Sequence, residues 1–338
     1  MAFLGQINYD QKSRLKKQKT RITTRNGDVF EETLSLEEGF EKVQIGSGAS
    51  IEFLNESENG FSSLKCKRFD ATEQLWKESG TSFPSISKTD VKLVTYNVWF
   101  SSKNWLNRAI VLFRIVKDQD PDVICFQEVT SDFLKVLLRE DWVRNLYFIS
   151  DALGSTVVPY GVVILSKIPM KHLTIHTLPT NMGRRFLMCE LEVSGCTIHI
   201  GTVHLESMQN TQIRLQQLER IQSITQSFSN VFILGDFNFH VQSTENRFIA
   251  DLDAWAKLHG LTDPQKSRRG PMIDRVISKS QVFVPTSMQV LGCEPVVPFD
   301  GHIIDIKDVT LAEKTFPLEY YPSDHDGLSV VFHNSKID

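Results

Sequence analysis

From residue 91 onward, apolar positions recur with the spacings of strands and helices. Short runs rich in Val, Ile, Leu and Phe predict strands at 91–99, 121–128, 161–167, 186–193, 196–206, 230–239, 272–278, 286–292 and 328–333. Apolar residues at helical spacing predict helices at 105–117, 131–140, 208–228 and 246–259. Strands often follow one another directly, with helices at intervals, and this order predicts a two-layered sheet sandwich flanked by helices.

Residues 1–90 have a different pattern. A basic cluster comes first and consists of Lys12, Arg14, Lys16, Lys17, Lys19, Arg21 and Arg25. An acidic tract follows, in segments rich in Ser, Gly, Asn and Glu with only short strand-like stretches. We therefore predict a partly ordered appendage over 1–90 and the main domain over 91–338. The basic cluster fits a nuclear-import signal and a solvated basic arm equally well.

Composition narrows the class of protein. With 338 residues, 41% of them hydrophobic, the chain is long and apolar enough to bury a sizeable core, which excludes a disordered protein. Its net charge of -4 implies that any contact with nucleic acid is local. The five cysteines form no CxxC pair, and no apolar run is long enough for a signal peptide or a bilayer span. We expect a reduced, soluble, intracellular protein.

Polar residues stand where the predicted strands end. These residues are Asn97, Glu128, His204, Asp236 with Asn238, Asp274, and Asp324 with His325. Each alone has an ordinary interpretation as a turn residue, a solvated carboxylate, a structural histidine, a helix cap or half of a surface ion pair. Those interpretations do not explain the whole set, whereas a common rim of the sandwich would bring the set together.

Together these residue types match the requirements of phosphodiester hydrolysis. A hard divalent cation needs a carboxylate ligand, for which Glu128 is the candidate. A water nucleophile needs a general base, for which Asp236 is the candidate. The negative charge that develops on the phosphate needs hydrogen-bond donors, and the candidates are Asn97, His204, Asn238 and His325. Asp274 is placed to keep His325 protonated.

The residues occur within a series of motifs in a fixed order. The motifs are LVTYNVWF, DPDVICFQEVT, NMGRRFLMCELEV, VHLES, LGDFN, MIDR and YPSDHDGL. In these motifs the chain from Val91 to Asn334 resembles the endonuclease/exonuclease/phosphatase superfamily, and within it the tyrosyl-DNA phosphodiesterase 2 family. The resemblance implies an α/β fold, specifically a four-layer α/β/β/α sandwich, and catalysis with Mg²⁺ or Mn²⁺ by the domain over 91–338.

The resemblance also implies a role for each matched residue. Asp236 would activate the water, and Asp274 would orient His325. His325 and Asn238 would stabilise the transition state. The residues implied for the metal site are Glu128, Asn97 and Asp324. The residues implied for substrate binding are Arg184, Arg185, His204, Glu206, Ser207, Phe239 and His240.

The activity implied by the resemblance is hydrolysis of the bond between a topoisomerase-derived tyrosine and a DNA 5′ phosphate, a DNA repair reaction. We expect a monomer in the nucleus and cytoplasm that acts on DNA 5′ ends carrying a tyrosyl adduct, without a membrane partner. Residues 1–90 contain no match to the ubiquitin-binding region of animal relatives, so ubiquitin binding is unsupported. The alternatives are an abasic endonuclease, a deadenylase-like RNA exonuclease, a phosphoinositide phosphatase, and an inert nucleic-acid-binding module.

Overall fold

The chain forms two compact units in the computed structural model, one comprising 1–55 with 296–320 and the other 56–295 with 321–338. The described residues are 60–80, 86–259, 272–293 and 321–337, together with the backbone of short strands elsewhere. In the first unit these strands are two antiparallel pairs, β1 (Gln18–Thr23) with β2 (Val29–Leu34) and β3 (Lys42–Gln44) with β4 (Ser50–Glu52). The second unit contains every candidate site residue and is described from here on.

The larger sheet of the second unit has the strand order β19-β20-β8-β9-β11-β10-β6-β7. The strands are β6 (Lys67–Asp70), β7 (Leu75–Glu78), β8 (Asp90–Asn97), β9 (Val123–Val129), β10 (Phe148–Ile149), β11 (Gly161–Ser166), β19 (Phe283–Leu291) and β20 (Gly327–Asn334). β8 and β9 run parallel, and the other neighbours are antiparallel. This arrangement places the C-terminal ends of β8 and β9 at one edge.

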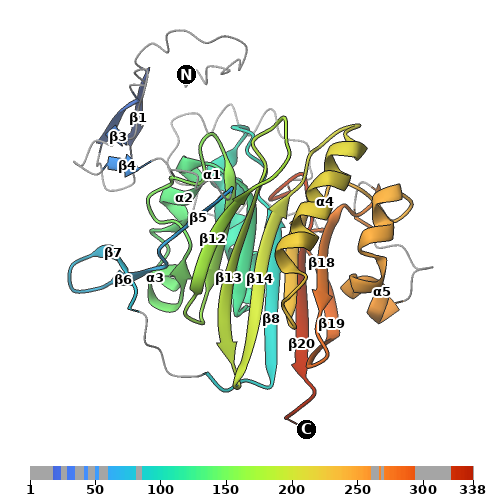
Figure 1. The fold of residues 1–338 in the computed structure, drawn as a ribbon. Helices are drawn as coiled ribbons and strands as arrows, with labels where there is room; N and C mark the ends of the chain where they lie inside the picture. The colour runs from blue at the N-terminus through green and yellow to red at the C-terminus, as the bar shows by residue number, and fades with distance from the viewer. Residues whose placement is uncertain are drawn as a thin grey trace. The chain divides into compact units, whose positions relative to one another are not determined.

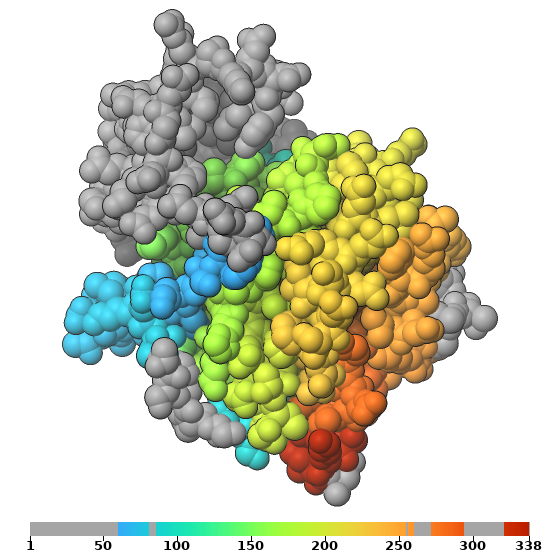
Figure 2. Space-filling model, in the orientation of Figure 1, coloured from blue at the N-terminus to red at the C-terminus, as the bar shows by residue number. Residues whose placement is uncertain are grey.

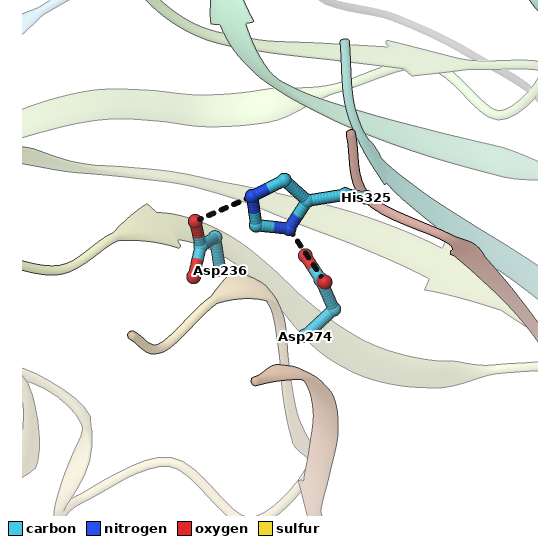
Figure 3. Close-up of side chains that lie close together, drawn as sticks. All are labelled: Asp236, Asp274 and His325. Carbon is cyan, nitrogen blue, oxygen red and sulfur yellow. Dashed lines mark hydrogen bonds and ion pairs between the residues drawn. The ribbon is translucent and has the colours of Figure 1, made fainter. Parts of the chain in front are cut away.

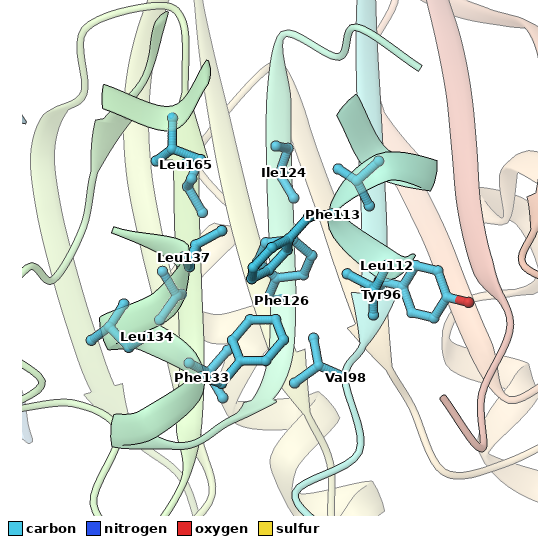
Figure 4. Packing of buried hydrophobic residues seen from close by; sticks show 14 of the residues in the cluster. Tyr96, Val98, Leu112, Phe113, Ile124, Phe126, Phe133, Leu134, Leu137 and Leu165 are labelled. Carbon is cyan, nitrogen blue, oxygen red and sulfur yellow. The ribbon is translucent and has the colours of Figure 1, made fainter. Parts of the chain in front are cut away.

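Three helices cover the outer face of the larger sheet: α1 (Trp105–Asp118), α2 (Ser131–Leu137) and α3 (Asp141–Leu146). In α1 the apolar residues at helical spacing are buried, as the sequence predicts. Phe133 of α2 lies edge-on to Phe113 of α1 and to Phe126 of β9, with ring centroids 5.2 and 5.8 Å apart (Figure 4). This core fixes α1 and α2 against the strands whose ends carry the candidate residues.

The smaller sheet has the strand order β18-β15-β14-β13-β12-β5. Its strands are β5 (Phe61–Ser63), β12 (Lys171–Thr177), β13 (Arg185–Val193), β14 (Cys196–His204), β15 (Val231–Asp236) and β18 (Asp274–Lys279). β14 and β15 run parallel, and the other neighbours run antiparallel. An additional short pair joins β16 (Lys266–Ser267) to β17 (Gly270–Pro271).

Helix α4 (Thr211–Thr225) covers the outer face of the smaller sheet (Figure 1). The 3-10 helices η1 (Thr244–Phe248) and η2 (Ala250–Leu252) and the short helix α5 (Ala254–His259) follow β15. Figure 2 shows α4, in yellow, beside this orange segment. Buried apolar residues of α4, the sheet and this segment form the second core cluster.

The inner faces of the two sheets pack on each other. Phe232 of β15 lies edge-on to Phe332 of β20, with ring centroids 4.8 Å apart. A buried polar group also crosses the interface, because Gln127 Nε2 donates to Thr202 Oγ1 at 3.0 Å and to Thr95 Oγ1 at 3.0 Å. The layers therefore run helices, sheet, sheet, helices. This confirms the predicted four-layer α/β/β/α sandwich.

Several predicted elements differ in detail from the observed ones. The helix predicted over 131–140 ends at Leu137, and a separate helix, α3, begins at Asp141. The segment 246–259 is divided between 3-10 helix and the short helix α5. Asn and Asp recur in the second segment, and both favour turns over helix interiors. None of the described helices is long and apolar enough to cross a membrane.

The strands β5, β6 and β7 come from the region assigned to the N-terminal appendage. β5 pairs with β12 at the edge of the smaller sheet, and β6 and β7 extend the larger sheet. The compact second unit accordingly begins at Glu56, before residue 90. The functional division into appendage and catalytic domain stays a prediction, and the basic cluster at 12–25 lies outside the residues whose side chains are described.

Candidate active site

Three neighbouring strands of the smaller sheet end in ionisable residues at the same level. His204 at the end of β14 lies opposite Asp236 at the end of β15, and Asp236 lies opposite Asp274 at the start of β18. The parallel pairing of β14 and β15 brings their C-terminal ends together, and antiparallel β18 begins where they end. Side chains directly opposite each other on one face lie within about 5.5 Å at Cβ. The sheet therefore brings together three residues that are distant in sequence.

His325 lies between two of these carboxylates (Figure 3). Its Nδ1 is 2.8 Å from Asp274 Oδ2, and its Nε2 is 3.7 Å from Asp236 Oδ2. Burial opposes a charge on the ring, but the two aspartates outweigh burial and raise the pKa of His325 to about 10. The ring is therefore protonated at neutral pH, as the sequence predicts for a histidine backed by Asp274.

Asp236 is almost fully buried at the end of β15. Burial raises the pKa of its carboxyl to about 7, against the opposing charge of His325 and with a contribution from Asp274. Asn97 Nδ2 donates to Asp236 Oδ2 at 3.1 Å, and the backbone N–H of Asn238 donates to Oδ1 at 2.9 Å. A carboxyl with a pKa near neutrality and a fixed orientation has the properties of a general base.

Asn97 connects the two sheets at this rim. Its Nδ2 lies 3.1 Å from Asp236 Oδ2, 3.2 Å from Glu128 Oε1 and 3.4 Å from His325 Nε2. Its Oδ1 accepts a hydrogen bond from the backbone N–H of Trp99 at 3.0 Å, which orients the amide. The structure thus brings Asn97, Glu128, Asp236 and His325 together, as the sequence predicts.

Glu128 and Asp324 fit the donor set of a hard cation. Burial raises the pKa of Glu128, hydrogen bonds from Phe100 and Asn97 oppose the shift, and the nearby Asp324 carboxylate adds to it. Asp324 Oδ1 is buried and has no hydrogen-bond partner among the described residues. Neighbouring carboxylates with an unpaired buried oxygen match the all-oxygen shell of Mg²⁺.

A second group could also hold a metal ion: ligand atoms of Asp236, Asp274 and His325 lie within 4.8 Å of one another. The Nδ1 of His325 is, however, engaged with Asp274 at 2.8 Å. A histidine ligates metal through a neutral ring nitrogen, so the raised pKa of His325 disfavours this group. Glu128 with Asp324 is the better candidate.

His204 is held neutral beside Asp236. Burial lowers the pKa of His204, and the charges of Arg184 and His325 lower it further. Arg184 Nη1 donates to His204 Nδ1 at 2.8 Å, so the ring proton sits on Nε2. That Nε2 lies 3.4 Å from Asp236 Oδ2. Both residues therefore lie at the rim, where the sequence predicts contact with the substrate.

Ser207 of the predicted substrate-binding set and Asn238 of the predicted catalytic set also lie near this rim. Ser207 is partly exposed, and its Oγ lies 3.2 Å from Met182 Sδ. Asn238 has a φ of 55°, and its Nδ2 donates to the backbone oxygen of Leu205 at 2.9 Å. The Asn238 amide nitrogen carries two protons, and this hydrogen bond uses one of them.

The remaining residues that are predicted to bind substrate are Arg185, Glu206, Phe239 and His240. Glu206 is fully buried, and its carboxylate accepts hydrogen bonds from Thr180 Oγ1 and from the backbone N–H of Asn181. Phe239 is buried in the core, with its ring edge-on to that of Phe237. Arg185 is the first residue of β13 and is partly exposed, and His240 is exposed. These contacts indicate structural roles for Glu206 and Phe239, whose substrate contacts stay predictions.

The motifs do not single out Phe100 and Tyr160, which lie next to Glu128 and Arg184. The backbone N–H of Phe100 donates to Glu128 Oε2 at 2.8 Å, and its ring is 51% exposed. It stacks on Tyr160 with ring centroids 4.7 Å apart and planes 5° from parallel, and Arg184 lies 5.7 Å from the Tyr160 ring. The sequence gives one signal for Phe100, which is a large aromatic residue in the loop that follows Asn97.

Comparison with known families identifies the class of protein. The profile of the Endonuclease/Exonuclease/phosphatase family matches residues 94–325. The chain belongs to this family, and the match spans the interval between β8 and His325. Family membership supports a hydrolase that acts on phosphate esters.

Two curated relatives are phosphodiesterases. Tyrosyl-DNA phosphodiesterase 2 of Danio rerio is 26% identical over 177 residues, which covers 50% of this chain and 47% of the relative. The 5′-tyrosyl-DNA phosphodiesterase of Caenorhabditis briggsae is 21% identical over 265 residues, 74% of this chain and 72% of the relative. The chain thus spans about half the length of the first relative and more of the second.

Solved structures share the fold. D. rerio TDP2 complexed with single strand DNA product superposes with a TM-score of 0.59 at 21% identity, covering 73% of this chain and all of that one. The human Nocturnin catalytic domain with bound sulfate anion gives a TM-score of 0.54 at 18% identity, covering 75% of this chain and 97% of that one. At these identities the likeness establishes the four-layer fold.

Proposed function

We propose that this protein is a divalent-metal-dependent phosphodiesterase. One observation carries the proposal: Asp236, His325 and Asp274 form a buried chain of contacts beside Asn97 and Glu128 at one rim of the sandwich. A general base, a protonated donor and a carboxylate site for a cation are the parts that phosphodiester hydrolysis needs.

Each residue has a defined task in this proposal. Asp236, with a pKa near neutrality, takes the proton from the attacking water. Asp274 holds His325 protonated, so that its Nε2 can donate to charge that develops on the phosphate oxygens. Asn97 fixes the spacing between these groups and Glu128. Glu128 and Asp324 would hold Mg²⁺, which supplies Lewis-acid stabilisation of the phosphate when it is bound.

The substrate we propose is a DNA 5′ end that carries a tyrosyl adduct. The names of both curated relatives support this choice. Chemistry supports it as well, because the leaving phenolate has a conjugate acid of pKa about 10, whereas a sugar alkoxide is far more basic and needs protonation as it departs. The described part of the rim provides a base, Asp236, two cationic side chains, His325 and Arg184, and an exposed aromatic surface in Phe100.

We further propose that the protein acts as a monomer in the nucleus and cytoplasm. The basic cluster over 12–25 supports import into the nucleus. Size-exclusion chromatography with light scattering tests the monomer. Fusion of residues 1–30 to a fluorescent reporter tests nuclear import, and a diffuse cytoplasmic signal would favour the solvated-arm interpretation.

A substrate panel tests the function. The purified protein is incubated with a 5′-phosphotyrosyl oligonucleotide, an abasic duplex and poly(A), each with Mg²⁺ and with EDTA. We expect fast release of tyrosine in Mg²⁺, no release in EDTA, and slow cutting of internal linkages in the same oligonucleotide. Equal or faster cleavage of the abasic duplex or of poly(A) would show that the protein is another nuclease of this family. Cleavage of none of the three substrates would reject the proposed phosphodiesterase activity on nucleic acid.

A further inference from the structure

Arg108 of α1 is a buried arginine whose guanidinium contacts backbone oxygens. Its side chain is 3% exposed. Nε donates to Lys103 O at 2.9 Å, Nη1 to Val98 O at 2.9 Å, and Nη2 to Ser101 O at 2.7 Å. Nη1 also donates to Pro322 O at 3.3 Å and Nη2 to Trp99 O at 3.0 Å. A guanidinium has five N–H donors, and these contacts supply an acceptor for each of them.

The loop that Arg108 holds has a strained backbone. Trp99 has a φ of 60°, which is unfavourable for a bulky side chain. Such a conformation persists only where the surroundings enforce it. The Arg108 guanidinium lies 4.5 Å from the centroid of the Trp99 ring and also binds the Trp99 carbonyl. Arg108 thus contacts both parts of the strained residue.

The same loop carries groups of the proposed active site. Asn97 precedes it, and the N–H of Phe100 donates to Glu128 Oε2 at 2.8 Å. Arg108 binds the carbonyls of Trp99 and Ser101, the residues on either side of Phe100. The position of the Phe100 amide, and with it the orientation of the Glu128 carboxylate, therefore depends on Arg108.

Arg108 also reaches the second segment of the site. Pro322, whose carbonyl it binds together with that of Val98, lies just before Asp324 and His325. A second contact parallels this one, since Ser323 Oγ donates to the backbone oxygen of Asn97 at 2.6 Å. The guanidinium bridges the loop after β8 and the segment before β20, and both segments adjoin residues of the site.

We propose that Arg108 is a positioning residue that keeps the strained loop 98–103 in the conformation required for cation binding at Glu128 and Asp324. This inference rests on the proposed function of that site. Removing partners that orient metal ligands commonly costs 10- to 100-fold in metal affinity or activity. A residue that only contributed packing to α1 would affect stability without a specific effect on the cation.

The test uses the full chain and Mn²⁺ as the probe. Binding of Mn²⁺ is measured by calorimetry without substrate, and kcat and KM are measured on the phosphotyrosyl oligonucleotide. Arg108→Lys keeps the charge but has too few donors for the carbonyls, and Arg108→Gln provides a second variant. Arg114→Lys is the matched control, because Arg114 is exposed on the same helix. We expect both Arg108 variants to bind Mn²⁺ about 10- to 100-fold more weakly, with the control unchanged.

A double variant separates positioning from packing. Glycine adopts positive φ without strain, so Trp99→Gly relieves the loop that Arg108 otherwise restrains. We expect the Trp99→Gly/Arg108→Lys protein to recover part of the Mn²⁺ affinity and kcat lost in Arg108→Lys, while KM changes little. Independent packing defects would instead multiply. The melting temperature of each variant establishes that it is folded.

Two results would overturn the inference. The first is wild-type Mn²⁺ affinity in a folded Arg108→Lys or Arg108→Gln protein. The second is a double variant whose losses are the product of the single losses. If neither Arg108→Lys nor Arg108→Gln folds, the double variant decides between the two roles. A folded double variant that binds Mn²⁺ supports strain relief, and an unfolded double variant supports packing. Wild-type protein that binds Mn²⁺ but cleaves no substrate would reject the proposed function and leave this inference standing.

Discussion

Two of the buried clusters of charge lie at Arg214 with Glu245 and at the rim that carries His325. In the first, which we call the Arg214 cluster, Arg214 Nε donates to Glu245 Oε1 at 2.8 Å, and Nη1 donates to the backbone oxygens of Glu206 and Met208. In the second, the rim cluster, His325 lies between Asp236 and Asp274. Both are removed from water, yet their hydrogen bonding differs.

The difference lies in which polar atoms have partners. No atom of Arg214 or Glu245 is among the buried unpaired side-chain atoms of the described residues, whereas Asp274 Oδ1 and Asp324 Oδ1 are. A fully paired buried network stabilises one conformation, while an unpaired buried oxygen costs free energy unless something else binds it. The comparison indicates that the Arg214 cluster holds the structure and that the rim cluster is built to receive a ligand.

Asp236→Asn tests the chemical half of the comparison and has the largest expected effect. The change keeps the shape and removes the base, so kcat should fall by on the order of 10²–10⁴. The melting temperature should be unchanged or higher, because a buried carboxyl is replaced by a neutral amide. Single-turnover kinetics and calorimetry provide the two readouts. Turnover near the wild-type rate would remove Asp236 from the mechanism.

Arg214→Leu tests the structural half. It leaves Glu245 buried without its partner, and we expect a loss of about 3–5 kcal/mol in the free energy of unfolding. Arg214→Leu/Glu245→Leu should restore much of that loss, because neither charge then remains buried. Urea unfolding of both proteins measures the effect. A single variant as stable as the wild type would contradict the assignment of this cluster to stability.

His176, which lies outside both clusters, provides a pH-dependent contrast to His325. Burial, with the charge of Arg220 adding to it, lowers the pKa of His176 to about 4, opposite to the shift of His325. Between the unfolded pKa of about 6.5 and the folded pKa, only the unfolded chain gains a proton at His176. As pH falls through that window, His176 therefore lowers the free energy of unfolding, by about 3 kcal/mol at most. No further loss from this residue is expected below pH 4. In His176→Gln the free energy of unfolding should fall less between pH 7 and 4.5, and an unchanged slope would reject the assignment.

Glu128→Gln tests whether the rim binds a cation through the Glu128 carboxylate. We expect the Mg²⁺ concentration at half-maximal activity to rise about 10- to 100-fold, because a hard-cation ligand is lost. The melting curve without Mg²⁺ should change little, since burial already disfavours the charged form. A Mg²⁺ titration decides, and an unchanged half-saturation would return Glu128 to a structural role.

Truncation is expected to give the smallest effect. Removal of residues 1–55 leaves the second compact unit whole, and activity should stay at the wild-type level. Removal of 1–85 also deletes β5, β6 and β7, so stability should fall while every proposed catalytic residue remains. Thermal melts and the phosphotyrosyl assay compare the two. Loss of activity in a folded 56–338 protein would place part of the active site in the N-terminal region.

The fold could be predicted where the apolar pattern is strong. Every residue of β9 is buried, and its apolar run over 123–126 predicts a strand. β5, β6 and β7 have three or four residues each and are half exposed, so their pattern is too short and too polar to stand out. These segments form strands because neighbouring strands supply the partners for their backbone hydrogen bonds.

Much of the candidate site could also be predicted, because residues at strand ends converge once the strands pair. The roles of Asp236, His325 and Glu128 stay predictions, although the structure brings them together. Phe239 alternates with Asn238 and therefore points into the core. Arg108 could not be found from sequence, since an arginine on an amphipathic helix is ordinarily a solvated residue and only the folded loop gives it acceptors.

The hydrogen bonds of Gln127 between the sheets restrict how this sequence can evolve. Thr95, Gln127 and Thr202 satisfy one another in an otherwise apolar interior. Replacing Gln127 by an apolar residue would leave the hydroxyls of Thr95 and Thr202 without this partner, at a cost of about 1–3 kcal/mol for each buried group. Single substitutions are therefore selected against, while joint replacement by apolar residues is tolerated. We expect these three positions to covary among homologues, so that all three are polar or all three are apolar.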